Sequence, residues 1–188
     1  MSEKSDALAV PVDVTMRRPT LVGVPAMPIP AAPLVVRRAQ VEEAGALAAL
    51  LGRAFEAESW DAAGTERELF CDETVRATLV VVAAGRLVAT ASLQVRRDVP
   101  ECGWVRWVAT DRDRRREGLA RALVIGVLRM GEQAGCREAR LRTHTYPLAA
   151  IPLYLQLGFE PLVTCDGERE VWERVIRLLS GNGSSIGR

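Results

Sequence analysis

Two spacings of apolar residues divide the middle of the chain into helices and strands. From Leu119 to Leu128, apolar pairs such as Leu123/Val124 and Val127/Leu128 recur four positions apart, which is the period of one buried helical face. Other stretches are short and rich in valine, as in strands. The pattern predicts strands at residues 34–38, 79–82, 87–95, 104–109 and 138–143, a hairpin turn between 82 and 87, helices at 44–55, 118–134 and a short segment ending near 158, and two further strand-like runs to about 176.

The two ends of the sequence lack these patterns. Residues 1–33 hold six of the ten prolines and no sustained periodicity, so we expect a flexible N-terminal arm. Residues 179–188 are rich in glycine and serine and offer little to bury, so we expect a flexible tail. The folded part is then one compact domain of residues 34–178, a normal size for a single domain.

Composition narrows the classes of function. The 25 Lys and Arg nearly cancel the 24 Asp and Glu, so the net charge of +1 provides no global attraction for nucleic acid or an anionic membrane. The four cysteines form no C-x-x-C cluster, so we expect no metal site. The sequence shows no signal-peptide pattern and no apolar run long enough to span a membrane, so we expect a cytoplasmic protein.

The most informative stretch runs from Val108 to Arg121, where a predicted strand enters an arginine-rich turn and then a long helix. The first N–H groups of a helix have no internal partners, and the helix dipole adds positive charge there, so such a junction can hold a phosphate. Gly118 and Ala120 leave room for that approach. By itself, such a charged turn is more often solvated surface than a binding site.

A second motif follows one strand later. The two motifs are Arg115-x-x-Gly118-x-Ala120 and Leu153-Tyr154-x-x-Leu157-Gly158-Phe159. As a pair, and at this separation, they resemble the motifs of the GNAT superfamily of acetyl-CoA-dependent N-acetyltransferases, with a likeness that covers about residues 34–176. The resemblance implies an α/β fold with a central mixed, mostly antiparallel twisted sheet of six to seven strands, flanked by about four helices and splayed between the fourth and fifth strands.

The resemblance also implies roles for particular residues. Main-chain groups of Val108 and Thr110 would pair with the pantetheine arm of acetyl-CoA, and amides from Arg116 to Arg121 would hold its pyrophosphate. Tyr154 would be the general acid that protonates the departing thiolate. The expected acetyl-CoA site consists of Val108, Ala109, Thr110, Arg115, Arg116, Glu117, Gly118, Leu119, Ala120 and Arg121, with Tyr154 as the catalytic residue and no metal.

Several positions depart from the family pattern. Arg116 stands where the first glycine of the pyrophosphate loop is usual, and Pro147 stands where many relatives carry an asparagine that contacts the cofactor. Pro152 inside the second motif predicts a helix that is bent or that begins only near Ile151. Tyr154 also suits a plain core position, because it shares a helical face with other apolar residues.

The general base is left open by the sequence. The strand from 104 to 110 contains no Asp or Glu, which leaves Glu101, His144 or ordered water as candidates. The expected activity is direct transfer of an acetyl group from acetyl-CoA to a primary amine of a small molecule or peptide in a ternary complex, and a homodimer is compatible with it. The alternatives are a non-catalytic acyl-CoA-binding domain and a nucleic-acid-binding protein that uses the arginine-rich turn.

Overall fold

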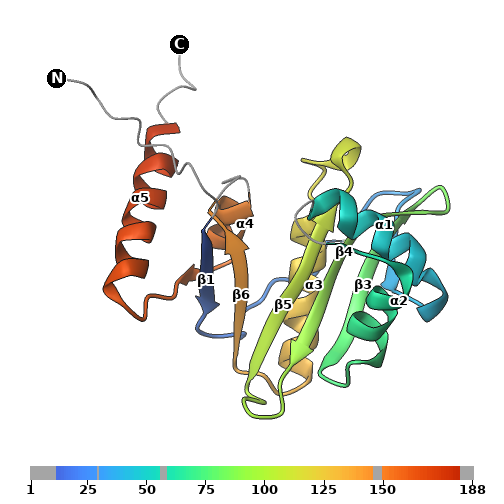
Figure 1. The fold of residues 1–188 in the computed structure, drawn as a ribbon, viewed down its shortest axis with the longest axis horizontal. Coiled ribbons are helices and arrows are strands. Elements are labelled where there is room, and N and C mark those ends of the chain that lie inside the picture. Colours follow the sequence, from blue (N-terminus) through green and yellow to red (C-terminus); the bar gives the residue numbers. More distant parts are fainter. Residues whose placement is uncertain (1–11, 29, 56–58, 146–149, 183–188) are drawn as a thin grey trace. The chain divides into compact units, whose positions relative to one another are not determined.

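The structure is a computed structural model that describes residues 12–28, 30–55, 59–145 and 150–182. These residues form seven strands and five α-helices of an α/β fold, where six to seven strands and about four helices were expected. The chain divides into two compact units, Pro19–Ala139, and Met1–Arg18 together with Arg140–Arg188. Figure 1 shows the elements of both units in sequence colours.

The larger unit is built on four antiparallel strands in the order β2-β3-β4-β5. They are β2 (Val35–Arg38), β3 (Val75–Ala83), β4 (Arg86–Val95) and β5 (Cys102–Thr110). The predicted hairpin is confirmed, because β3 and β4 are joined through Ala84 and Gly85, whose φ angles are 46° and 76°. Positive φ at both turn residues is typical of the two-residue turns whose twist matches that of paired strands.

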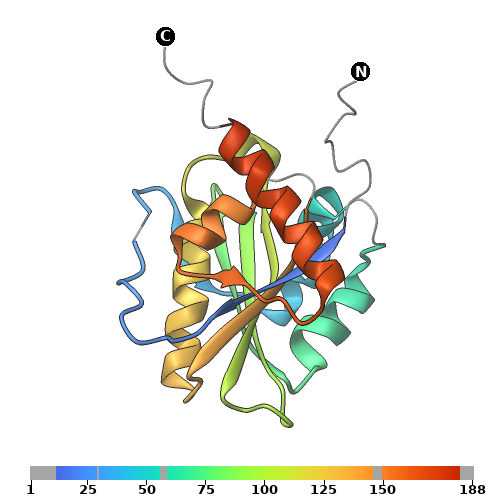
Figure 2. The same ribbon diagram turned by 90° about the vertical axis from the view of Figure 1, so that its left-hand side faces the viewer.

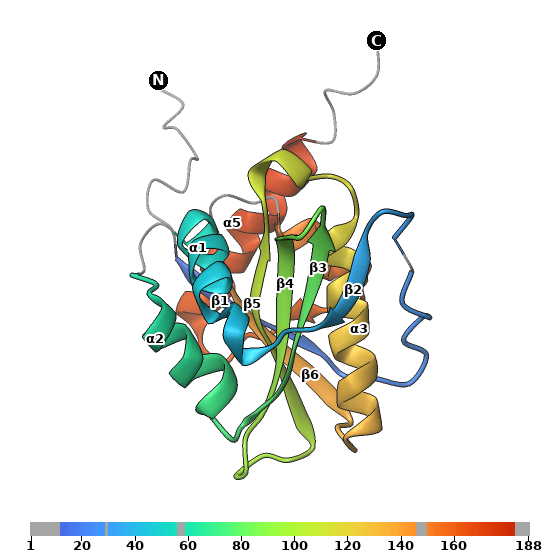
Figure 3. The same ribbon diagram turned by 90° about the vertical axis from the view of Figure 1, so that its right-hand side faces the viewer.

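Helices cover both faces of this sheet, as Figure 3 shows. The covering elements are α1 (Ala44–Ala54), α2 (Ala62–Glu66) and the π-helical turn η2 (Arg67–Cys71) on one face, and α3 (Leu119–Gln133) on the other. Leu47 and Leu51 of α1 pack with Val80 of β3 in one buried cluster. Its neighbour Leu79 lies close to Gly126 of α3, since successive side chains of a strand point to opposite faces.

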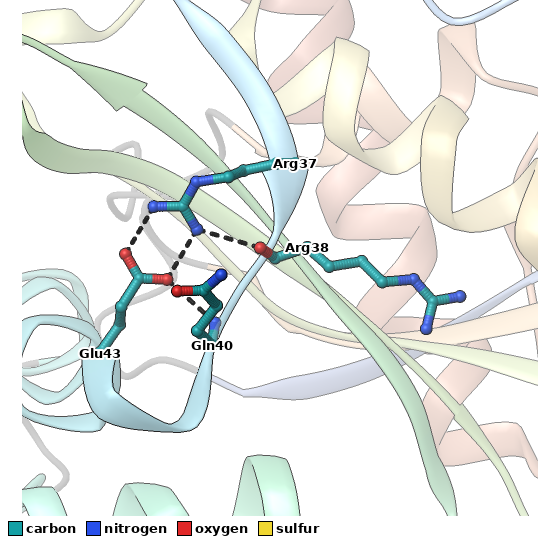
Figure 4. A network of polar contacts seen from close by, with 4 residues as sticks. All are labelled: Arg37, Arg38, Gln40 and Glu43. Atoms are coloured by element: carbon teal, nitrogen blue, oxygen red, sulfur yellow. Dashed lines mark hydrogen bonds and ion pairs between the residues drawn. The ribbon is translucent and has the colours of Figure 1, made fainter.

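A polar network fixes the turn between β2 and α1 (Figure 4). The Arg37 guanidinium donates to both oxygens of the Glu43 carboxylate, at 2.6 and 2.7 Å, and to the carbonyl of Arg38, at 3.0 Å. The same carboxylate accepts the N–H of Gln40 at 2.9 Å, which closes the start of the 3₁₀ turn η1 (Val41–Glu43). The Arg37 hydrogen bonds hold the pKa of Glu43 below its usual value, so this network is complete at neutral pH and weakens in acid.

The expectation of a flexible arm over residues 1–33 is wrong for much of that segment. Val14 and Met16 are buried on one side of strand β1 (Asp13–Arg18). Leu21 is buried in the larger unit, and its N–H donates to the carbonyl of Arg137 at 2.9 Å. Val12, Val14 and Met16 alternate with polar residues, as in a half-buried strand, but the prolines on both sides of this short stretch outweighed that pattern in the prediction. Residues 1–11 of the expected arm lie outside the described residues.

The smaller unit contains the strand order β6-β1-β7, with the N-terminal strand β1 between two strands from the C-terminal part of the chain (Figure 2). Its other elements are β6 (Glu138–His144), α4 (Ile151–Gln156), β7 (Glu160–Pro161) and α5 (Asp166–Asn182). The Thr145 N–H donates to the carbonyl of Val12 at 2.8 Å, and the Leu162 N–H donates to that of Thr15 at 3.0 Å. Main-chain hydrogen bonds thus bind this N-terminal segment to partners on both of its sides.

Helix α5 occupies a segment where two other features were expected, strand-like runs to about residue 176 and a flexible tail from 179. Its buried residues Trp172 and Val175 are three positions apart, which is helical spacing. At its start, the Glu168 carboxylate accepts both the N–H and the hydroxyl of Thr164, at 2.6 and 2.8 Å. The burial of this helical face outweighs the strand preference of the β-branched residues in the segment, and the closure of the first turn adds to it. Residues 183–188 of the expected tail lie outside the described residues.

Candidate anion and acyl-transfer site

The loop between β5 and α3 contains two left-handed residues. After Thr110, Asp111 caps the short 3₁₀ turn η3 (Arg112–Arg114), and the chain then passes through Arg116 at φ 70° and Gly118 at φ 78° before α3 begins. For Arg116, this conformation costs about 1 kcal/mol that a glycine would avoid. That cost explains why the family pattern favours glycine at the position where this chain carries Arg116.

The N-terminus of α3 is open. Gly118 precedes the first helical residue and has no side chain to cap the helix, and no acidic residue occupies the first turn. The first amide bonded back into the helix is that of Ala122, which donates to the carbonyl of Gly118 at 3.0 Å. A Cβ built on Gly118 meets no atom within 4 Å. A 15-residue helix with unpartnered first-turn amides and open space before them favours an anion at this end.

Two of the three acidic residues of the loop, Asp111 and Glu117, are engaged by arginines. The Arg114 guanidinium donates to both oxygens of the Glu117 carboxylate, at 2.7 and 2.8 Å. Asp111 lies 3.4 Å from Arg53 and 3.9 Å from Arg86, which come from α1 and from the start of β4. These pairs neutralise Asp111 and Glu117, and the exposed arginines of the loop outnumber its remaining acidic residue, Asp113.

Arg115 and Arg116 are two of these exposed arginines. Within the part of the chain that the structure describes, neither of them forms an ion pair with a carboxylate. Their charge adds to the field of the helix N-terminus and so favours a polyanionic ligand such as a diphosphate.

Strand β5 contains a bulge that the sequence did not indicate. Ser92 of β4 lies opposite Arg106, but Thr90, two residues earlier, lies opposite Ala109, so β5 carries one residue more than its partner. Trp107 sits at the bulge with φ 50°, a conformation that is rare for a bulky residue. A bulge removes main-chain groups from the ladder and is common beside active sites. No glycine or proline marks this position, so residue pattern alone could not have found it.

The structure places the three predicted strand residues next to this bulge. Val108 and Thr110 are partly buried and Ala109 is fully buried, all at the end of β5 that leads into the open helix N-terminus. The Thr110 hydroxyl is buried and has no hydrogen-bond partner among the described residues. The predicted cofactor residues of β5, the loop and the first turn of α3 are therefore contiguous within the larger unit.

Tyr154 lies in the smaller unit, on helix α4. The helix begins at Ile151, so Pro152 falls in the first turn, where a missing N–H breaks no helical hydrogen bond. The predicted start near Ile151 is confirmed, and Pro152 does not interrupt the turn that carries Tyr154. Pro147 lies outside the described residues, so the expected loss of an asparagine contact there stays a prediction.

The surroundings of Tyr154 set its protonation state. Its ring is buried and packs edge-on against Phe159, with ring centroids 5.9 Å apart. Burial raises the pKa of Tyr154 to about 12. The phenol is therefore neutral at physiological pH, and can donate a proton but cannot serve as a base.

The structure describes the surroundings of Glu101 and His144, the two side chains considered as general base. Glu101 precedes β5, whereas the loop follows β5, and nine extended residues separate the two by about 30 Å. His144 is exposed and its Nδ1 lies 2.8 Å from the carboxylate of Asp13, which also pairs with Arg142. These contacts give His144 a place in an exposed polar cluster with Asp13 and Arg142.

The described residues also bear on metals and membranes. They contain no group of three or more His, Cys, Asp or Glu side chains placed to hold a metal ion. Among them, too, no helix combines the length and the apolar character that crossing a membrane requires.

Comparison with a family profile identifies the family of this chain. The profile of the acetyltransferase (GNAT) family matches residues 46–159, which is more than half of the chain, and the chain belongs to this family. The predicted family and α/β fold class are thereby confirmed. A search of the curated proteins finds no match to this sequence.

Solved structures show the same fold. The chain is similar to a protein described as a GNAT-family acetyltransferase from Novosphingobium aromaticivorans, with a TM-score of 0.61 and 24% identity over 80% of this chain and 59% of that one. The chain is also similar to a GCN5-related N-acetyltransferase from Sphaerobacter thermophilus, with a TM-score of 0.67 and 22% identity over 81% of this chain and 49% of that one. The ribosomal-protein alanine N-acetyltransferase of Escherichia coli matches with a TM-score of 0.59 and 25% identity, over 69% of this chain and 79% of that one. This chain thus spans half to three-fifths of the length of the first two.

Proposed function

We propose that this protein transfers the acetyl group of acetyl-CoA to a primary amine of a small molecule or peptide, by direct attack of the amine in a ternary complex. The observation that carries the proposal is the open N-terminus of α3, which the chain reaches through the left-handed residues Arg116 and Gly118 of the family motif. The activity takes place in the cytoplasm in this proposal, without a metal ion.

The residues present fit the cosubstrate. Amides from Arg116 to Arg121 would bind the pyrophosphate, because they belong to the loop and to the first helical turn, where amides lack helical partners. Main-chain groups of Val108 and Thr110 would bind the pantetheine arm, and the unpartnered Thr110 hydroxyl supplies a further polar contact. Acetyl-CoA itself brings an acyl group activated as a thioester.

The chain's own groups supply the rest of the chemistry. Tyr154 donates its phenolic proton to the sulfur that leaves, because its raised pKa keeps that proton bound until it is needed. A main-chain N–H freed by the bulge at Trp107 stabilises negative charge on the reacting carbonyl oxygen. The attacking amine must arrive neutral and give up one proton, which water accepts. The mechanism therefore needs no carboxylate on β5.

Pro152 was one reason to consider a non-catalytic acyl-CoA-binding domain. Its place in the first turn of α4 removes that reason, since the turn with Tyr154 is formed normally. The net charge of +1 argues against the nucleic-acid alternative, because it provides no broad basic surface for a nucleic acid.

Thiol release from acetyl-CoA tests the proposal. The purified protein is incubated with acetyl-CoA and a panel of amino acids, polyamines, aminoglycosides and peptides with free N-termini, the last chosen because the relative from Escherichia coli acts on an alanine of a ribosomal protein. Calorimetry with acetyl-CoA is run in parallel. Binding with amine-dependent thiol release supports the proposal; binding without release across the whole panel favours the non-catalytic alternative, and no binding rejects both.

A further inference from the structure

Arg18 joins the N-terminal strand to the helix that carries Tyr154. It is the last residue of β1, and its Nη1 donates a hydrogen bond to the main-chain carbonyl of Leu157, the residue that ends α4. Its Nε is buried and has no partner among the described residues. Arg18 lies outside residues 46–159, the part matched by the family profile, so this contact is a feature of this chain beyond the family motif.

The end of α4 is shaped to receive this guanidinium. Gly158 follows at φ 78°, and a Cβ at that position would collide with the Arg18 Nη1, so the close approach depends on glycine. The last carbonyls of a helix lack internal donors, and a positive charge beside them is favoured by the helix dipole. A six-residue helix has little stability of its own, so an external contact at its end matters more than in a long helix.

Strand β1 holds Arg18 in place from the other side. Met16 lies opposite Pro161 and Arg17 opposite Glu160 in the antiparallel pair with β7, and the Leu162 N–H donates to the carbonyl of Thr15. The segment from α4 to β7 is thus fastened to β1 both at the helix end and along the following strand. A shift of Arg18 would release the first of these attachments.

We propose that Arg18 is a positioning residue that fixes the orientation of Tyr154 for proton transfer. Tyr154 is three residues before Leu157, within the last turn of α4, and its carbonyl accepts the Phe159 N–H at 3.0 Å, so the helix end and the tyrosine move together. The inference rests on the proposed role of Tyr154 as the general acid.

A double-mutant cycle tests this inference with the full-length protein and the best amine from the panel. The variants are Arg18→Met, Tyr154→Phe and the combination, with kcat and KM for acetyl-CoA measured for each. Arg18→Met is expected to lower kcat about 5- to 20-fold, since small misplacements of catalytic groups cost up to about 100-fold, and to change KM less than about twofold. In the Tyr154→Phe background, the same substitution is expected to change kcat less than about twofold, because the group it positions is already gone.

Arg37→Met is the matched control. Arg37 also donates a guanidinium hydrogen bond to a main-chain carbonyl, that of Arg38, and belongs to the larger unit and not to the one that holds α4. The substitution Arg37→Met should lower the free energy of unfolding and leave kcat unchanged. If Arg18→Met does not fold, Arg18→Lys, which keeps the charge and one donor, enters the same cycle under the same criterion.

The outcomes separate the two hypotheses. An Arg18 effect that disappears when Tyr154 is Phe supports the inference. An equal fold-loss in both backgrounds overturns it, because a merely structural role lowers the active fraction regardless of Tyr154. No effect of Arg18→Met while Tyr154→Phe is impaired overturns the inference alone, whereas full activity of Tyr154→Phe removes the proposed acid and the inference with it.

Discussion

Replacing Gly118 with alanine tests main-chain recognition of the cosubstrate directly. A Cβ at this position meets no atom within 4 Å, so no clash is expected in the free protein. The left-handed conformation at φ 78° costs a residue with a Cβ about 1–2 kcal/mol, and loss of glycine's freedom in the unfolded chain returns about 0.4–1 kcal/mol. The net loss of about 1 kcal/mol should lower the melting temperature by about 2–4 °C.

The effect on binding is expected to be larger than the effect on stability. The added methyl projects from the residue that immediately precedes the first-turn amides of α3, the proposed pyrophosphate site, into space that no described atom occupies. A hydrogen bond to a charged group contributes about 1.5–3 kcal/mol, so losing one raises the Kd for acetyl-CoA about 10- to 100-fold. Isothermal calorimetry measures this Kd, and differential scanning calorimetry measures the stability of the same samples.

Gly135→Ala is the matched control for this experiment. Gly135 follows the other end of the same helix at φ 88° and likewise has no neighbour within 4 Å of a built Cβ. It should lose similar stability and bind acetyl-CoA normally. Equal changes of Kd in the two variants, or an unchanged Kd in Gly118→Ala, would refute main-chain recognition at the helix N-terminus.

Four further predictions concern Tyr154, Arg116 and Leu21. Tyr154→Phe should lower kcat at least about tenfold with little change in acetyl-CoA binding, because only the proton donor is removed; unchanged kcat would exclude Tyr154 from the mechanism. Because burial raises the pKa of Tyr154 from 10.0 to about 12, the unfolded chain loses this proton first as pH rises, so chemical denaturation should show a fall of about 2–3 kcal/mol in unfolding free energy between pH 10 and 12 that Tyr154→Phe lacks. Arg116→Ala should raise the Kd for acetyl-CoA less than Gly118→Ala does, and the opposite order would indicate recognition by side chains. Leu21→Ala should cost about 2–4 kcal/mol in urea unfolding, whereas a flexible arm would show no change.

The parts of the fold that could be predicted are those with local signals. The helix from 118 to 134 was recovered as Leu119–Gln133, with Gly118 before it and Gly135 after it, because apolar period and glycine stops lie within the segment itself. The hairpin of β3 and β4 was recovered for the same reason, since its turn and both valine-rich strands are adjacent in sequence.

The parts that could not be predicted depend on distant partners. Strand β1 is stabilised by residues more than a hundred positions away, such as Pro161 opposite Met16, and no short window of sequence contains both. The helix α5 was mistaken for strand because Val171, Val175 and Ile176 are β-branched, and what decides is the burial of one helical face. Likewise, the bulge at Trp107 becomes visible only in the register between two strands.

The candidate site also has a part that the sequence motifs predict and a part that they do not. The loop residues from Arg115 to Arg121 and Tyr154 were predicted by motif, because the family keeps residue types at fixed spacing there, and their roles stay a proposal. The contact between Arg18 and Leu157 follows no motif, since it joins the first strand to a helix near the other end of the chain.

The placement of β1 has a consequence for how the protein folds during its synthesis on the ribosome. Its partners β6 (Glu138–His144) and β7 (Glu160–Pro161) emerge long after β1 itself, whereas Pro19–Ala139 is one uninterrupted stretch. The contiguous unit can therefore fold while synthesis continues, and the first strand must wait, unpaired, for the last third of the polypeptide. Ribosome-bound chains from which only residues 1–139 have emerged should accordingly leave β1 open to protease while the contiguous unit gains protection.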